Sequence, residues 1–388
     1  MAEITILYGT NRRHRGKRWH PSGYGTAFSE DGAENLRFGR AELEYDQDKV
    51  QRYLRRDCGP VGTGDGQGLA GYLGKRARKA KLTAFVETLE RDVPDHEQPE
   101  ARRGSAEFFA TLKQWMDAGD DVLVYIHGYN VNWNDALSGA AALQLMLESK
   151  VPDAAQTGGL AVRATRVVLF SWPSDGSMMP FVAYRDDRTE AEASGRAVGR
   201  ALLKFRDFLV HLRAAAKRER GTLCGGRVHL LCHSMGNYVL GHALARMAQF
   251  HRGATLPRLF DEVFLCAADV NDDALEPSRT LGALHATCSR ISVYSNTGDF
   301  ALDLSDWTKG NPERLGSTGP ANMRATHRKA HHIDCSAIVT GAIEHDYYLG
   351  GQPNADIALS LAGVTDDAAS RGRERVEDAP RSYRLPRQ

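Results

Sequence analysis

A serine at the end of an apolar strand-like run carries the clearest chemical signal in this 388-residue sequence. Residues 228–232 are apolar apart from His229, the tetrapeptide His-Ser-Met-Gly follows at 233–236, and a helical apolar period begins directly afterwards. In a nucleophile elbow, a serine occupies a strained strand-to-helix turn, which needs small residues where the two backbones approach closely. Gly236 supplies one such residue. The pattern predicts that Ser234 is a nucleophile.

Two features of this segment count against that interpretation. The glycine that usually stands two residues before the serine is replaced here by Cys232, whose small side chain an elbow could tolerate. A serine at this place could also be a simple N-cap for the following helix. The strand before it, together with His233 and Gly236, favours the nucleophile.

A serine nucleophile needs hydrogen-bond donors for the oxyanion, and a second strand end offers one. The strand-like residues 122–126 lead into His127-Gly-Tyr129, where hydrolases place their second donor. We expect the backbone amides of Tyr129 and Met235 to converge on the developing charge. His127 is interpreted as a structural histidine that holds this loop.

The base should be a histidine late in the chain, because α/β hydrolases carry serine, acid and histidine in that order. His345 follows the last predicted strand and the loop 341–344, whereas His327, His331 and His332 precede or open that strand. Two carboxylates compete to orient the histidine: Asp299, after strand 290–294, and Asp269, after strand 262–267. We favour Asp299, and Asp269 could cap a helix or line the pocket.

The apolar segment after residue 172 follows a strand end on the same side as the serine. It indicates either core packing or a cap and acyl pocket over Ser234, within residues 173–190. The residues predicted for the substrate pocket are His127, His233, Trp172, Phe181, Tyr184 and Asp269.

A group of metal-ligating residue types lies at 327–335, but strand alternation would send these side chains to opposite faces. We therefore expect no metal site and no cofactor.

These residues must be positioned by a parallel sheet. From about residue 120, short apolar runs alternate with helical segments, which predicts the α/β class. The expected strands are 122–126, 166–170, 228–232, 262–267, 290–294 and 333–339, with earlier ones at 4–8 and 42–45. The expected helices are 105–118, 134–148, 189–217 and 237–249.

Three segments fall outside this alternation. Residues 9–40 have a loop-like pattern, and the glycine-rich and basic stretch 59–81 indicates a flexible surface loop inserted into the domain, because its spacing does not fit a phosphate-binding loop. Residues 363–388 contain few large apolar side chains, which predicts a disordered tail. The remainder, 1–362, is expected to form a single domain.

Composition narrows the class of protein. The formal charge is +1, which gives no support for a nucleic-acid binder. No run of eighteen apolar residues occurs, and the first ten residues alternate like a strand rather than a secretory signal. Six scattered cysteines do not form a disulfide framework. We expect a cytoplasmic protein without a membrane span.

Several blocks of the sequence resemble a known family. They are 8–12 (YGTNR), 38–40 (FGR), 127–130 (HGYN), 170–174 (FSWPS) with Gly176, 184–194, 233–237 (HSMGN), 268–270 (ADV), Asp299 with 301–302 (AL), and His345. The sequence is similar, over about residues 3–350, to bacterial α/β hydrolases of unknown function described as esterase/lipase-superfamily enzymes. It has Ala-Ala-Asp at 267–269 where that family has Ala-Pro-Asp.

This resemblance implies the α/β-hydrolase fold, with a mostly parallel central sheet flanked by helices, and the triad Ser234, Asp299 and His345. The expected function is cleavage of a small-molecule or lipid ester through an acyl-enzyme on Ser234. The alternatives are a non-catalytic interaction protein on the same scaffold and a lipid-targeting toxin or defence hydrolase. A peptidase or acyltransferase could use the same triad.

Overall fold

The structure is a computed structural model that describes residues 1–88, 97–174, 180–218, 225–251, 256–299, 301–302, 313–339 and 344–387. The side chains at 180–186, 212–213, 215–218 and 251 lie outside this description.

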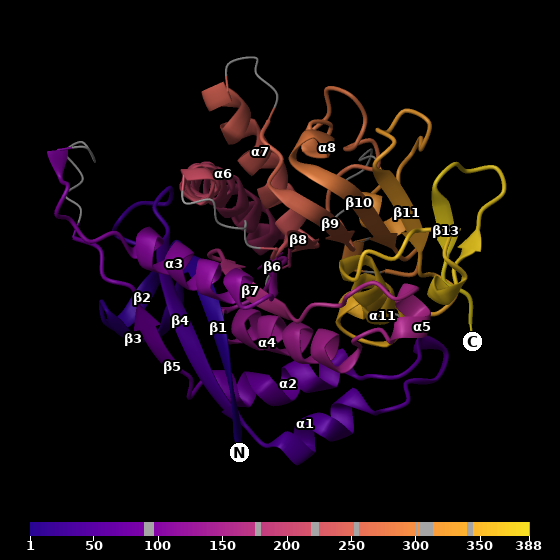
Figure 1. The fold of residues 1–388 in the computed structure, drawn as a ribbon, viewed down its shortest axis with the longest axis horizontal. Helices are drawn as coiled ribbons and strands as arrows, with labels where there is room; N and C mark the ends of the chain where they lie inside the picture. The colour runs from indigo at the N-terminus through magenta and orange to yellow at the C-terminus, as the bar shows by residue number, and fades with distance from the viewer. Residues whose placement is uncertain are drawn as a thin grey trace.

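A long sheet runs through the described part of the chain (Figure 1). Its strands, in spatial order, are β12 (Glu374–Arg375), β13 (Ser382–Arg384), β11 (Ala330–Asp334), β10 (Cys288–Ser295), β9 (Phe260–Cys266), β8 (Val228–His233), β6 (Asp121–Ile126), β7 (Thr165–Ser171), β1 (Ala2–Thr10), β4 (Arg37–Tyr45) and β5 (Lys81–Ala84). The pairs from β13 to β1 are parallel, whereas β12, β4 and β5 pair antiparallel with their neighbours. The predicted α/β class is confirmed.

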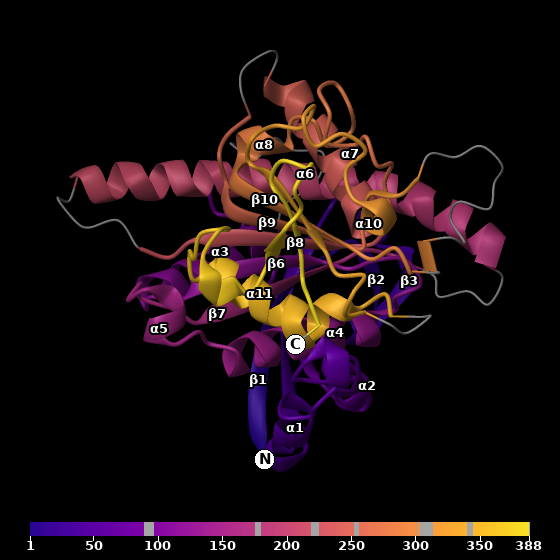
Figure 2. The same ribbon diagram turned by 90° about the vertical axis from the view of Figure 1, so that its right-hand side faces the viewer.

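Helices cover both faces of the sheet, with α6 and α7 on one side and α1, α2 and α4 on the other (Figure 2). Their bounds are α1 (Gln47–Leu54), α2 (Gly66–Ala77), α3 (Gly104–Asp117), α4 (Trp133–Ser149), α5 (Ala154–Thr157), α6 (Pro180–Arg218), α7 (Gly236–His251), α8 (Leu284–Thr287), α10 (Leu315–Thr318) and α11 (Gly351–Leu361). The four predicted helices correspond to α3, α4, α6 and α7 and are confirmed.

Strand alternation divides the interior into two cores. In β6, Leu123 and Tyr125 face the core under α4, whereas Val122 and Ile126 face the core under α6 and α7. Because both faces are covered, the central strands have nearly continuous apolar runs. The carboxyl ends of the parallel strands all emerge at one edge, which is where Ser234 follows β8.

The last predicted strand is misplaced. β11 spans Ala330–Asp334 instead of 333–339, and it contains His331 and His332. After it, the chain turns, with the amides of Ile338 and Val339 donating to the carbonyl of Cys335. Cys335, Ile338 and Val339 are buried there in a turn, which explains why this apolar run resembled a strand.

The expectation of a loop over 9–40 is wrong for most of this range and holds for 29–36, which lie between two strands. β1 extends to Thr10, β2 (Arg12–Lys17) and β3 (His20–Phe28) form a hairpin, and β4 begins at Arg37. The hairpin strands are polar and lack apolar alternation, so they have no sequence signature of a half-buried strand. Tyr24 anchors the hairpin, since its hydroxyl contacts that of Tyr8 at 2.8 Å and its ring packs on Trp133.

The glycine-rich segment is also ordered, as a short 3-10 turn η1 (Gly59–Val61) followed by α2. Asp65 caps α2 by accepting from the amide of Gly68, and Leu69, Leu73 and Ala77 form a buried stripe at helical spacing. A Cβ at Gly66 would lie 2.0 Å from the carbonyl oxygen of Leu349. Gly66 therefore allows the start of α2 to pack closely against Leu349 and does not mark a flexible loop.

The predicted disordered tail instead returns to the sheet as β12 and β13, after the 3-10 turn η4 (Ala369–Arg371). Arg371 Nε and Arg373 Nη2 contact the carboxylate of Asp356 on α11 at 3.1 and 2.6 Å. These ion pairs are buried, and they fix the position of the segment against α11.

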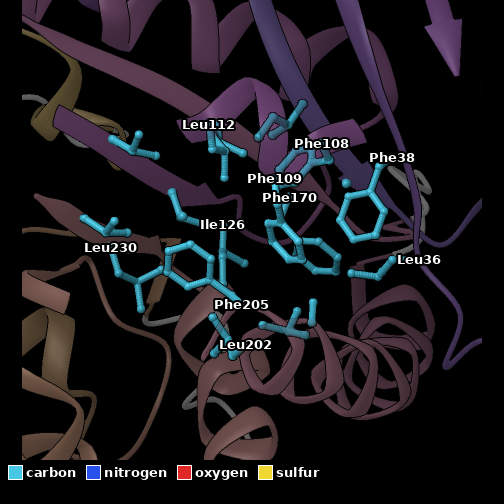
Figure 3. A pocket seen from close by; sticks show the side chains of 18 of the residues that line it. Leu36, Phe38, Phe108, Phe109, Leu112, Ile126, Phe170, Leu202, Phe205 and Leu230 are labelled. Atoms are coloured by element: carbon cyan, nitrogen blue, oxygen red, sulfur yellow. The ribbon is translucent and has the colours of Figure 1, made fainter. Parts of the chain in front are cut away.

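A cavity of about 80 Å³ lies between the sheet and helices α3 and α6 (Figure 3). Its lining is apolar and includes Phe108, Ile126 and Phe205. Neither Ser234 nor His345 lines it, so we assign it to the core and not to the site at the strand ends.

None of the helices in the described ranges combines the length and apolarity that a membrane crossing requires.

Candidate active site

Ser234 occupies a strained turn between β8 and α7. Its φ angle is +52°, in the left-handed region that side chains other than glycine rarely adopt. Its backbone is held on both sides, because its amide donates to the carbonyl of Cys266 at 3.0 Å and its carbonyl accepts from the amide of Asp269 at 3.2 Å. This is the geometry of a nucleophile elbow.

Gly236 and Asn237, which follow Ser234 in the chain, explain how the turn is built. A Cβ at Gly236 would lie 2.6 Å from the carbonyl oxygen of Ile126, so only glycine lets α7 start this close to the end of β6. Asn237 was not predicted as a site residue from its chemistry, yet its side-chain amide donates to the carbonyls of Cys232 and Ser234. Asn237 thereby closes the turn on its own strand.

The loop after β6 approaches the serine directly. A Cβ at Gly128 would lie 2.7 Å from Cβ of Ser234, so the backbone of this loop is packed against Ser234. Tyr129 follows Gly128, and Met235 follows the serine. Gly128 and Ser234 therefore approach each other closely, and each is followed in the chain by one of the two predicted oxyanion donors.

His345 and Asp299 form a direct contact beside this elbow. Nδ1 of His345 donates to Oδ2 of Asp299 at 2.7 Å, and the carboxylate of Asp299 is inaccessible to solvent. The backbone carbonyl of His345 is 3.3 Å from Nε2 of His233, the residue before the serine. The structure therefore brings the predicted acid and base together, next to the segment that carries Ser234.

The electrostatic surroundings change the basicity of His345. Burial alone would lower its pKa, but the hydrogen bond to Asp299 and the charges of Asp299, Asp346 and Asp269 outweigh burial, so the pKa of His345 is raised above its ordinary value. Since Nδ1 is bound to Asp299, Nε2 is the nitrogen that can exchange a proton.

Asp269, the alternative acid, has a different partner. Its carboxylate Oδ1 lies 3.4 Å from Nε of Arg314, and both side chains are nearly inaccessible. Arg314 also donates to Oδ1 of Asn271 at 3.0 Å. Asp269 thus forms a contact with a buried arginine, and its charge raises the pKa of His345 without a hydrogen bond between them.

The predicted pocket residues are distributed differently from expectation. His127 and Trp172 are completely buried with stacked rings, so they pack behind the loop and do not face a substrate. His233 is buried between the rings of His345 and Tyr348, where burial and the charge of His345 lower its pKa well below the ordinary value. The side chains of Phe181 and Tyr184, and most of the predicted cap, lie outside the described residues.

Tyr347 and Asp346 are further site residues that sequence reasoning missed. The hydroxyl of Tyr347 donates to the carbonyl of Tyr294 and accepts from the amide of Ala267, so it joins the ends of β10 and β9. A carboxylate oxygen of Asp346 lies 3.5 Å from Nε2 of His233. The only sequence signal for Tyr347 and Asp346 was their position directly after His345.

Among the described residues, no group of three metal-ligating side chains is close enough to hold a metal ion.

A mostly parallel sheet with a strained serine after its central strand, and with a histidine–aspartate pair at the same edge, defines the α/β hydrolases as the class. The family model described as "Alpha/beta hydrolase of unknown function (DUF900)" matches residues 104–360. The chain belongs to this family.

Solved structures were compared as well. One match is the esterase B of Lactobacillus rhamnosis with a C6-C4 SN3 inhibitor, with 12% identity and a TM-score of 0.33, covering 63% of this chain and 77% of that one. Another is the phospholipase PlaB of Legionella pneumophila in complex with thio-NAD, with 13% identity and a TM-score of 0.23, covering 59% and 40%. No curated protein matches the chain.

Proposed function

We propose that this protein is a serine hydrolase that cleaves carboxylic esters through an acyl-enzyme on Ser234. The observation that carries the proposal is the 2.7 Å contact between His345 Nδ1 and Asp299, at the sheet edge where Ser234 occupies a strained turn. A strained serine costs stability, and such strain is concentrated at functional sites.

In the proposed mechanism, Nε2 of His345 takes the proton from Oγ of Ser234 while Oγ forms a bond to the ester carbonyl carbon. The carbonyl oxygen becomes an oxyanion that accepts hydrogen bonds from the amides of Tyr129 and Met235. The C–O bond to the alcohol then breaks, and His345 returns the proton to the leaving oxygen. Asp299 remains ionised and stabilises the imidazolium.

The second half of the reaction repeats these roles. His345 deprotonates a water molecule, the hydroxide oxygen bonds to the acyl carbon, and the Ser234–acyl bond breaks as Oγ recovers the proton. The products are a carboxylic acid and an alcohol. No cofactor is required for these steps.

The proposal is tested with a fluorophosphonate probe, which labels activated serines, and with p-nitrophenyl esters of increasing acyl length. Wild type should be labelled and Ser234→Ala should not, with kcat reduced about a million-fold, as for triad serine loss in a serine protease. Matched thioester and anilide substrates separate esterase from thioesterase and peptidase activity. A folded wild-type protein that takes no label would overturn the proposal and favour the non-catalytic interaction protein.

A further inference from the structure

A polar cluster is buried against the loop 127–131. Its members are Arg12, His127, Ser171, Ser174 and Asp187, and each has no solvent-exposed surface. They come from the start of β2, the ends of β6 and β7, and helix α6, so only the fold brings them together. We call this group the Arg12 cluster.

Arg12 links three segments through one guanidinium. Its Nη2 donates to the carbonyl of Val131 at 2.6 Å, its Nε donates to Oγ of Ser171 at 2.9 Å, and its Nη1 donates to the carbonyl of Gly25 at 3.1 Å. The planar fork of arginine makes these directed contacts possible, and lysine could not reproduce them. The far end of the loop is therefore tied to the hairpin and to β7.

Asp187 holds the same part of the loop from α6. Its Oδ2 accepts from Oγ of Ser174 at 2.6 Å and from the amide of Asn130 at 3.4 Å. Oγ of Ser174 in turn accepts from the amide of Val131 at 3.2 Å. Asn130 has a φ of +56°, so this stretch of backbone is itself strained and depends on such contacts.

His127 fixes the beginning of the loop. Its Nδ1 donates to the carbonyl of Gly128 at 2.8 Å, and its Nε2 accepts from the amide of Trp172 at 3.2 Å. The indole nitrogen of Trp172 donates to the carbonyl of His127 at 2.9 Å. Burial and the charge of Arg12 lower the pKa of His127 well below its ordinary value, which keeps the ring neutral and able to accept.

Tyr129 lies at the centre of this arrangement. The backbone at residues 127, 128, 130 and 131 is held by the contacts above, and Gly128 is packed on the serine. Burying a guanidinium and a carboxylate is costly, and a buried pair of charges is weak support for stability alone. A preorganised oxyanion donor, in contrast, requires such a rigid support.

We propose that Arg12 and Asp187 are positioning residues for the oxyanion hole, which hold the loop 127–131 so that the amide of Tyr129 stays aimed at the developing oxyanion. This inference rests on the proposed serine hydrolase function. Neither residue contacts the reacting atoms, so each acts through the backbone of the loop.

The test uses the full-length protein with Arg12→Lys, which keeps the charge but loses the fork, and Asp187→Asn, which keeps the shape. Each should lower kcat about a hundredfold while KM stays within about threefold, because a misplaced donor weakens binding of the transition state only. The inhibition constant of an alkyl trifluoromethyl ketone, which forms an oxyanion on the serine, should rise in proportion to the loss of kcat/KM.

The matched control is Arg290→Lys. Arg290 is also largely buried and donates to Glu262 at 2.7 Å and to two backbone carbonyls, but it lies near the amino end of β10, away from the strand ends that carry the site. Arg290→Lys should have a lower Tm than wild type. Its kcat, calculated per titrated active site, and its affinity for the ketone should be unchanged. Ser174→Ala, a milder change in the same cluster, carries the test if Arg12→Lys does not fold.

This inference is overturned if folded variants of the Arg12 cluster keep the wild-type kcat. It is also overturned if KM and the inhibition constant of the ketone rise by the same factor. Either result leaves the proposed serine hydrolase function standing. A wild-type protein that neither takes the fluorophosphonate label nor hydrolyses esters would overturn both proposals.

Discussion

His345 and Asp299 are 46 positions apart in the chain, yet Nδ1 of one donates to Oδ2 of the other at 2.7 Å. The contact orients the imidazole so that its second nitrogen is available for proton transfer. It also distinguishes Asp299 from Asp269, whose carboxylate lies against Arg314.

The first prediction concerns these two carboxylates. Asp299→Asn should reduce kcat about ten-thousand-fold, because an amide cannot stabilise the imidazolium and favours the wrong tautomer. Asp269→Asn should have a much smaller effect on kcat, although it leaves Arg314 without its carboxylate and should lower Tm. Steady-state kinetics with thermal unfolding of both variants checks this, and the reverse order of the kinetic effects would assign the acid to Asp269.

The pH dependence provides a second prediction. The base must be neutral to accept a proton, so kcat/KM should rise with pH through the pKa of His345. Because Asp299 and its neighbours raise that pKa, the midpoint should lie above the ordinary value of 6.5. In Asp299→Asn the midpoint of the residual activity should move to lower pH. A wild-type midpoint below 6.5 would contradict this electrostatic description.

A third prediction concerns the loop at Gly128. In Gly128→Ala the new Cβ would meet Cβ of Ser234 at 2.7 Å, so the loop must shift and kcat should fall at least tenfold. Gly71→Ala is the control, since nothing lies within 4 Å of a Cβ there. It lies within α2 and should leave kcat unchanged and stabilise the protein by up to about 1 kcal/mol. Equal activity of the two variants would refute the close approach.

The fourth prediction concerns the C-terminal segment. The side chain of Asp356 is buried with Arg371 and Arg373, so Arg373→Ala should lower the free energy of unfolding by about 3–5 kcal/mol. Desolvation opposes ionisation, but the two arginines outweigh it and lower the pKa of Asp356. This contribution should therefore be present above the ordinary carboxyl pKa and be lost as the pH falls below it.

Urea unfolding at neutral and acidic pH measures this effect. Removal of residues 364–388 should destabilise the protein at least as strongly, and removal of 387–388 alone should not. If the longer truncation left the stability unchanged, the C-terminal segment would not be part of the folded domain.

Short stretches of sequence were sufficient to predict the elements whose residue pattern lies within one stretch. The apolar runs that became β6, β8 and β9 predict buried parallel strands because both their faces are covered. The strand, serine, glycine and helix around Ser234 predict the elbow because the turn needs Gly236 within two residues. The candidate triad Ser234, Asp299 and His345 was also proposed from the sequence, because these residues follow one another in the α/β-hydrolase order.

The tertiary structure decided what depends on partners far away in sequence. The hairpin β2–β3 and the segment 364–387 have polar sequences whose order comes from contacts such as Tyr24 with Trp133 and Arg373 with Asp356. The choice between Asp299 and Asp269 depends on which carboxylate reaches His345 in space. The role that we propose for Arg12 depends on its contacts with Val131 and Ser171, which exist only once β1, β6 and β7 lie side by side.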